Sequence, residues 1–195
     1  MALNEVLLDE LRDMYSAENQ LVKALPKLAK GAHSKDLKSL FTAHLEETKG
    51  QVVRLKQVFE LLGKKRTGEH CNGMEGVIEE GADALEKDEK GASFDSGLIG
   101  AALRTEHYEI AGYTATIAMA KVLGLSEVAS LLKENLEEEL TAAEKILAAS
   151  QAILSQSAGE PEQKQGPKSA KEKYSAKKSK EDEKKAAPAI KRRAS

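Results

Sequence analysis

The sequence predicts an all-α protein, a four-helix bundle whose one long crossover carries a short fifth helix. Three observations support this fold. Residues 1–156 hold four long segments in which apolar residues recur at steps of three and four, the spacing that lines one face of an α-helix. Short turns join these segments in pairs, and a long connection separates the pairs. The chain is rich in Ala, Leu, Glu and Lys and lacks Trp, a composition typical of helical proteins.

The first two helices are expected at about Asn4–Lys30 and Ser34–Gly63, within the few residues of error of such boundaries. Pro26 removes one backbone hydrogen bond from the first helix, so we expect a kink or an early end there. Ser34 is the type of residue that caps a helix N-terminus. The turn Gly31–His33 is short, and it therefore predicts antiparallel neighbours.

The third and fourth long helices are expected at about Ser96–Leu123 and Ser126–Ser155, joined at Gly124. The connection Lys64–Asp95 is too long for a hairpin loop, and its apolar residues between Met74 and Leu85 follow a helical spacing. A crossover of this length allows the second and third long helices to run parallel.

Each long helix places a carboxylate in the middle of its apolar stripe. These residues are Glu18, Glu47, Glu106, and either Glu138 or Glu139. An ionised carboxylate in an apolar core costs several kcal/mol or more unless it is paired. The stripes carry no Lys or Arg near these glutamates, so a shared metal ion is the simplest source of positive charge. The alternatives are solvated glutamates at the stripe edges, or a buried network with Lys or Arg.

Oxygen-rich ligands in a helical bundle favour iron or manganese over zinc. On the third long helix, Glu109 lies one turn after Glu106 and is a further candidate ligand. On the second helix, His44 and Gln51 both lie one turn from Glu47. Two alternatives on the fourth helix stay open. The segment that ends at Glu138 resembles the segment that ends at Glu47, 91 residues earlier, and this favours Glu138 as the ligand. The neighbouring row of apolar residues on the same helix (Leu132, Leu136 and Ile146) instead favours Glu139.

Several ordered motifs resemble the YciE/YciF ferritin-like family of bacterial stress proteins over about Leu3–Ser150. They are Tyr15-x-x-Glu18-x-Gln20-Leu21, His44-Leu45-Glu46-Glu47-Thr48, Cys71-x-x-Met74-Glu75-Gly76 with Glu79-Glu80-Gly81, and Glu106-His107-Tyr108-Glu109. The resemblance implies a ferritin-like bundle, a di-iron carboxylate centre, a homodimer and a link to osmotic or oxidative stress. Members of this family are often labelled ferroxidases, but we assign no residue of this chain a catalytic role beyond the metal centre.

Residues 157–195 differ from the rest of the chain. They carry 12 Lys and Arg against 6 Asp and Glu, and few apolar residues. We expect a disordered tail, because such a composition cannot offset the entropy of folding, and weak contact with nucleic acid is the functional alternative. The N-terminus lacks a secretion signal, no apolar run spans a membrane, and a single cysteine suits a reducing compartment, which together predict a cytoplasmic protein.

The functional hypothesis is a carboxylate-bridged centre of two iron ions per chain, with manganese as the alternative. In this hypothesis Glu47 and Glu138 (or Glu139) bridge or cap the metals, and Glu18 and Glu106 are terminal ligands. The expected chemistry is oxidation of Fe(II) by O2 or peroxide, or removal of peroxide. The rival is a non-catalytic, stress-associated helical scaffold that acts through its dimer surface or its basic tail.

Overall fold

The computed structural model describes residues 2–67, 69–85 and 91–159. Within these residues the chain forms five α-helices and no strand. They are α1 (Leu3–Gly31), α2 (Lys35–Leu61), α3 (Asn72–Leu85), α4 (Ala92–Val122) and α5 (Ser126–Gly159). The predicted all-α fold, with its long crossover and short additional helix, is confirmed.

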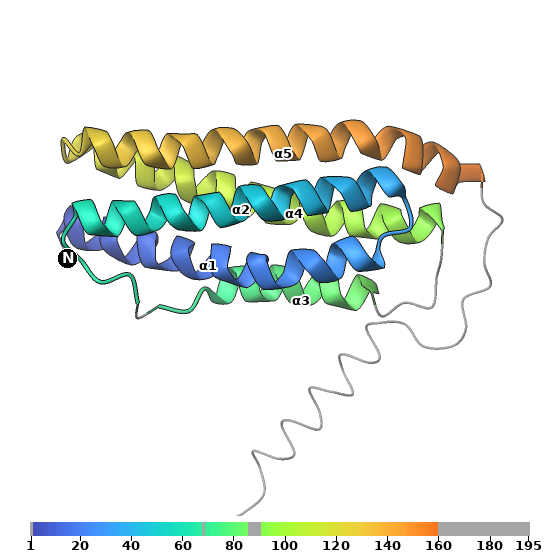
Figure 1. Ribbon diagram of the computed structural model, residues 1–195, viewed down its shortest axis with the longest axis horizontal. Coiled ribbons are helices and arrows are strands. Elements are labelled where there is room, and N and C mark those ends of the chain that lie inside the picture. Colours follow the sequence, from blue (N-terminus) through green and yellow to red (C-terminus); the bar gives the residue numbers. More distant parts are fainter. Residues whose placement is uncertain (1, 68, 86–90, 160–195) are drawn as a thin grey trace, which may run out of the picture. The chain divides into compact units, whose positions relative to one another are not determined.

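The four long helices lie side by side as a bundle, and α3 packs along α1 and α4 (Figure 1). The short turns make α1–α2 and α4–α5 antiparallel hairpins, whereas the crossover leaves α2 and α4 running in the same direction (Figure 1). This arrangement is the one-crossover topology of ferritin-like bundles. It points one face of each long helix at a common interior.

The helices differ from the sequence-based expectation in several places. α1 continues through Pro26 to Gly31, so the missing backbone bond does not end the helix. α4 begins at Ala92, about one turn earlier than predicted. The added turn carries Asp95, whose buried carboxylate accepts hydrogen bonds from the backbone N–H groups of His33 (2.9 Å) and Ser34 (2.5 Å). Asp95 thereby fastens the start of α4 to the α1–α2 turn.

Of the predicted tail, residues 157–159 belong to the end of α5. The remainder of the tail expectation concerns residues 160–195, which lie outside the described residues. In the described part of the chain, no helix has an apolar stretch long enough to cross a membrane.

The apolar core is divided into two clusters. One cluster lies towards the α1–α2 turn and includes Leu21, Leu25, Leu37, Phe41, Leu98, Ile99 and Ile146. The other lies towards the α4–α5 turn and includes Leu7, Leu11, Leu55, Phe59, Tyr113, Ile117 and Leu132. All four long helices also place buried polar side chains in the interior, among them Glu18, His44, Gln51, Glu106, Glu109 and Glu139. We call this set the polar layer.

Candidate metal centre

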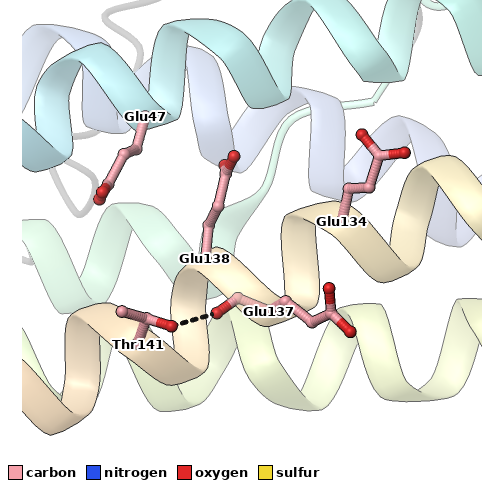
Figure 2. A pocket seen from close by; sticks show the side chains of 5 residues that line it. All are labelled: Glu47, Glu134, Glu137, Glu138 and Thr141. Atoms are coloured by element: carbon pink, nitrogen blue, oxygen red, sulfur yellow. Dashed lines mark hydrogen bonds between the residues drawn. The ribbon is translucent and has the colours of Figure 1, made fainter.

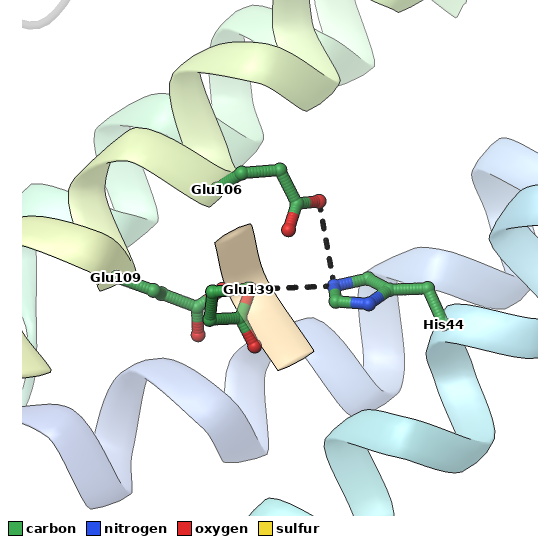
Figure 3. A group of neighbouring side chains, drawn as sticks. All are labelled: His44, Glu106, Glu109 and Glu139. Atoms are coloured by element: carbon green, nitrogen blue, oxygen red, sulfur yellow. Dashed lines mark ion pairs between the residues drawn. The ribbon is translucent and has the colours of Figure 1, made fainter. Parts of the chain in front are cut away.

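Four side chains of the polar layer bring possible metal-ligand atoms together. They are His44 from α2, Glu106 and Glu109 from α4, and Glu139 from α5, and one ligand atom of each lies within 4.8 Å of the others (Figure 3). All four side chains are buried. Glu106 and Glu109 are three residues apart, so one turn of α4 presents both carboxylates to the same interior point.

His44 points one ring nitrogen into this group and the other away from it. Its Nε2 lies 3.4 Å from Glu106 Oε1 and 3.8 Å from Glu139 Oε2. Its Nδ1 lies 3.3 Å from Glu47 Oε2. An ionised carboxylate can only accept a hydrogen bond, so in the tautomer that donates from Nδ1 to Glu47, Nε2 keeps the lone pair that a metal requires.

Glu47 therefore orients His44 from outside the group. Its side chain is 31% exposed, and its other carboxylate oxygen lies 3.4 Å from the ammonium of Lys145. The hydrogen bond from His44 is the main reason that the pKa of Glu47 lies below its ordinary value. A carboxylate that fixes the tautomer and the orientation of a histidine ligand is a common neighbour of metal sites. The sequence-based hypothesis gave Glu47 a direct role as a bridging or capping ligand.

Glu18 reaches the polar layer from α1 and is fully buried. The hydroxyl of Tyr113 donates a hydrogen bond to Glu18 Oε1, and Asn135 Nδ2 donates to the same hydroxyl at 2.9 Å. Tyr113 thus holds Glu18 in one orientation and leaves Glu18 Oε2 without a hydrogen-bond partner.

Gln51 contacts the group through its amide. Its Nε2 donates to Glu139 Oε1, while its own Oε1 is buried without a hydrogen-bond partner. The amide nitrogen occupies one oxygen of Glu139 and leaves Oε2 facing the group. Gln51 Oε1 is a neutral oxygen that a metal ion could also accept as a ligand.

The two glutamates that the sequence left as alternatives have different surroundings. Glu139 is fully buried and belongs to the group of four. Glu138 is 31% exposed and pairs with the guanidinium of Arg54. Arg54 also donates to Asn135 Oδ1, so Arg54 and Asn135 connect Glu138 to Tyr113 and Glu18. Arg54 is a cation near these glutamates that the apolar stripes did not reveal, because it lies one turn beyond Gln51 at the edge of the α2 stripe.

Burial strongly disfavours the charged forms of the carboxylates in this layer. It is the largest cause of the raised pKa values of Glu18, Glu106 and Glu109, and the neighbouring carboxylates raise all three further. A divalent cation bound among them would oppose both effects by stabilising the ionised carboxylates.

The donor atoms suit a metal ion. Within the described residues, seven buried side-chain atoms lack a hydrogen-bond partner, and every one belongs to the polar layer. They are Glu18 Oε2, His44 Nε2, Gln51 Oε1, Glu106 Oε2, both oxygens of Glu109, and Glu139 Oε2. Native proteins rarely leave buried polar atoms unsatisfied. Six oxygens and one imidazole nitrogen form a donor set that fits iron or manganese.

An acidic pocket of about 310 Å³ lies on the outside of the bundle between α2 and α5 (Figure 2). It is lined by Glu47, Glu134, Glu137, Glu138 and Thr141. Three of these carboxylates already pair with cations: Glu47 with Lys145, Glu138 with Arg54 and Glu137 with Lys133. The buried group is therefore the stronger candidate for a metal site.

The fold and this layer define an all-α, one-crossover bundle with a buried carboxylate–histidine cluster at mid-height. The family model described as "Domain of unknown function (DUF892)" matches residues 2–159. The chain belongs to this family, which is the YciF family that its motifs resemble.

Two relatives support this assignment, and a third protein shares the fold. Protein YciF of Escherichia coli K12 is 46% identical over 140 residues, covering 70% of this chain and 83% of YciF. The crystal structure of the E. coli stress protein YciF matches with a TM-score of 0.78 at 41% identity, covering 80% of this chain and 98% of that one. YcfI from Rhodopseudomonas palustris gives a TM-score of 0.73 at 41% identity, covering 75% and 94%. A Xanthomonas campestris protein shares the fold at 24% identity, with a TM-score of 0.64 and coverage of 79% and 94%.

Proposed function

We propose that the polar layer binds one or two iron or manganese ions, and that the protein uses them to oxidise Fe(II) with O2 or peroxide, or to consume peroxide. The observation that carries this proposal is the set of buried, unpartnered ligand atoms, of which those on α2, α4 and α5 lie close together. Their desolvation is costly without a bound cation. The proposal thus gives a reason for placing so many carboxylates in one core.

The residues that would hold metal are His44, Glu106, Glu109 and Glu139, with Glu18 and Gln51 Oε1 completing the set. Bound iron or manganese would supply the one-electron redox steps by which O2 or peroxide is reduced while Fe(II) is oxidised. Glu47, Glu138 and the remaining exposed acids take no place in this ligand set.

The neighbouring residues position these ligands. Glu47 keeps the proton of His44 on Nδ1, Tyr113 orients Glu18, and the amide of Gln51 directs Glu139 Oε2 towards the centre. Such contacts fix ligand geometry before metal arrives. The two apolar clusters close the layer from above and below and limit the access of water.

Metal analysis tests the proposal. The protein, expressed with iron or manganese in the medium and washed with chelator, should retain between one and two metal ions per chain. Glu106→Gln with Glu109→Gln should lose most of this metal and all oxidation of added Fe(II), while the helical content stays unchanged. Glu134→Gln, in the outer pocket, is the matched control and should behave as the parent. A metal-free protein that remains folded and inert towards Fe(II) would refute the proposal and favour the scaffold alternative.

A further inference from the structure

The guanidinium of Arg54 lies between the outer acidic pocket and the interior of the bundle. On the pocket side, Arg54 Nη2 pairs with Glu138, which lines the pocket (Figure 2). On the inner side, Arg54 Nε donates to Asn135 Oδ1. Asn135 and Glu138 are three residues apart, so one turn of α5 presents both side chains to the same guanidinium. Arg54 thus connects a solvent-exposed carboxylate to a fully buried amide.

The hydrogen bonds continue inward from this amide to a candidate metal ligand. Asn135 Nδ2 donates to the hydroxyl of Tyr113 at 2.9 Å, and this hydroxyl donates to Glu18 Oε1. Asn135, Tyr113 and Glu18 are all fully buried. The contacts lead from α2 through α5 and α4 to α1, and so they join the four long helices. We call Arg54, Asn135 and Tyr113 the donor chain.

The hydrogen bonds of the donor chain can run in only one direction. A guanidinium has five donors and no acceptor, so the amide atom that faces Arg54 must be the carbonyl oxygen of Asn135. The amide nitrogen then faces Tyr113, and it can only donate. The Tyr113 hydroxyl has a single proton, and because it accepts from Asn135 this proton is directed to Glu18. The charge at one end thereby determines where the last proton lies.

Arg54 is also the main reason that Asn135 keeps this orientation. A flipped amide would set its NH2 group against the guanidinium, where two sets of donors would face each other. The Tyr113 hydroxyl can donate or accept, so it does not oppose a flip. The remaining contact of the amide is a long one, 3.5 Å from Asn135 Nδ2 to the backbone oxygen of Gln51. A flipped amide would accept the Tyr113 proton and take it away from Glu18.

We propose that Arg54 is a positioning residue for the metal centre: through Asn135 and Tyr113 it keeps a proton on the Oε1 side of Glu18 and leaves Oε2 available to a metal ion. The inference rests on the proposed function, because Glu18 is one of the proposed ligands. Glu18 Oε2 is buried without a hydrogen-bond partner, which is the arrangement that the donor chain produces. Glu138 holds the guanidinium in place from the pocket side.

Charge alone predicts the opposite effect of Arg54. A cation close to a metal site repels the metal ion, so the loss of its charge should strengthen metal binding. In the proposed role, the loss of Arg54 should weaken metal binding, because Glu18 loses its fixed orientation. The sign of the change therefore separates a positioning role from a purely electrostatic one.

Titration of the metal-free full chain with Mn(II) tests the proposal, with free Mn(II) measured by electron paramagnetic resonance. Arg54→Met keeps the length of the side chain and removes its charge and donors. It should raise the dissociation constant about tenfold, the lower end of the cost of losing a contact that orients a metal ligand. Arg12→Met is the matched control. Arg12 is also half-buried and pairs with Asp9 at 3.1 Å, outside the polar layer, so its loss should leave Mn(II) binding unchanged.

The same substitution in a Tyr113→Phe background tests whether Arg54 acts through the donor chain. Without the Tyr113 hydroxyl, Arg54 has no route to Glu18. Arg54→Met should then leave the dissociation constant for Mn(II) unchanged or lower it through the loss of positive charge. A general structural role of Arg54 would weaken binding in both backgrounds. Circular dichroism checks that each variant remains folded.

A measurement on the metal-free protein follows the donor chain directly. In ¹⁵N-labelled protein, Arg54→Met should shift and broaden the side-chain amide signals of Asn135, because the amide is released from its single orientation. Arg12→Met should leave these signals in place. Asn135 signals that Arg54→Met does not change would overturn the proposal.

The titrations distinguish failure of this proposal from failure of the proposed function. A parent chain that binds Mn(II), together with an Arg54→Met variant that binds it as tightly or more tightly, would overturn the role of Arg54 and leave the metal centre standing. Equal weakening by Arg54→Met with and without the Tyr113 hydroxyl would also overturn it. A parent chain that binds no Mn(II) would overturn both proposals.

Discussion

Tyr113→Phe removes one buried hydroxyl and keeps the aromatic ring. In the parent protein this hydroxyl donates to Glu18 Oε1 and accepts from Asn135 Nδ2, and Tyr113 is fully buried. The substitution therefore breaks two hydrogen bonds and leaves an acceptor and a donor unpaired in the core. An unpaired buried group costs about 1–3 kcal/mol, so the two together should lower the free energy of unfolding of the metal-free protein by about 2–4 kcal/mol.

Thermal unfolding followed by circular dichroism measures this effect. At about 2–4 °C per kcal/mol for a chain of this size, the midpoint should fall by about 5–15 °C. Tyr15→Phe is the matched control, because the Tyr15 ring packs edge-on against Phe59 at 6.0 Å and no hydrogen bond to its hydroxyl is found in the described structure. Its effect should stay below about 0.5 kcal/mol.

The metal-bound protein should respond differently. Without Tyr113 to orient it, Glu18 should bind metal less well, so Tyr113→Phe should lower the affinity for added Mn(II) as well as the stability. Equal unfolding midpoints for Tyr113→Phe and Tyr15→Phe would refute the reasoning, since they would mean that the Glu18–Tyr113–Asn135 contacts contribute nothing.

Three further predictions concern the carboxylates, the thiol and the tail. The pKa values of Glu106 and Glu109 are raised in the folded protein, so the folded state keeps protons that the unfolded chain releases above about pH 4.5. The free energy of unfolding of the metal-free protein should therefore fall as the pH rises from about 4.5 towards neutrality. The stability of the metal-bound protein should change much less. Urea titrations over that pH range measure this, and a flat profile for the metal-free protein would contradict it. Cys71 is buried, and burial raises the pKa of its thiol. Alkylation of Cys71 at neutral pH should therefore be slow until denaturant is added. Rapid labelling of the native protein would show that the region around Cys71 opens. Deleting residues 160–195 should remove any weak, salt-sensitive binding of DNA and leave the metal content unchanged, and DNA binding that survives the deletion would place the contact on the bundle.

The sequence predicted the bundle well because its information is periodic. Apolar residues at steps of three and four specify both the helices and the sides they bury, and short turns specify which helices are antiparallel neighbours. The same periodicity placed Glu18 and Glu106 inside, and both are buried. The start of α4 was harder to predict, because the partners of Asp95 lie in the distant α1–α2 turn.

Periodicity could not decide between residues that are neighbours in sequence. Glu138 and Glu139 differ by one position; Glu139 is buried, whereas Glu138 pairs with Arg54 from another helix. Glu47 lies at the edge of its stripe, and only the position of His44 Nδ1 shows that its carboxylate contacts the histidine. The contact between Arg54 and Glu138 joins two helices and carries no signal in the spacing of a single chain.

The polar layer also has a consequence for how the bundle unfolds. Stability can differ between parts of a fold, and here a layer of polar side chains separates two apolar clusters. Without a bound cation, this layer would be the weakest part of the core. It would separate the half of the bundle that packs on α3 from the half near the α4–α5 turn. A bound ion would join α2, α4 and α5 across it and couple the two halves. Metal binding would then determine whether the chain unfolds in parts or as one cooperative unit.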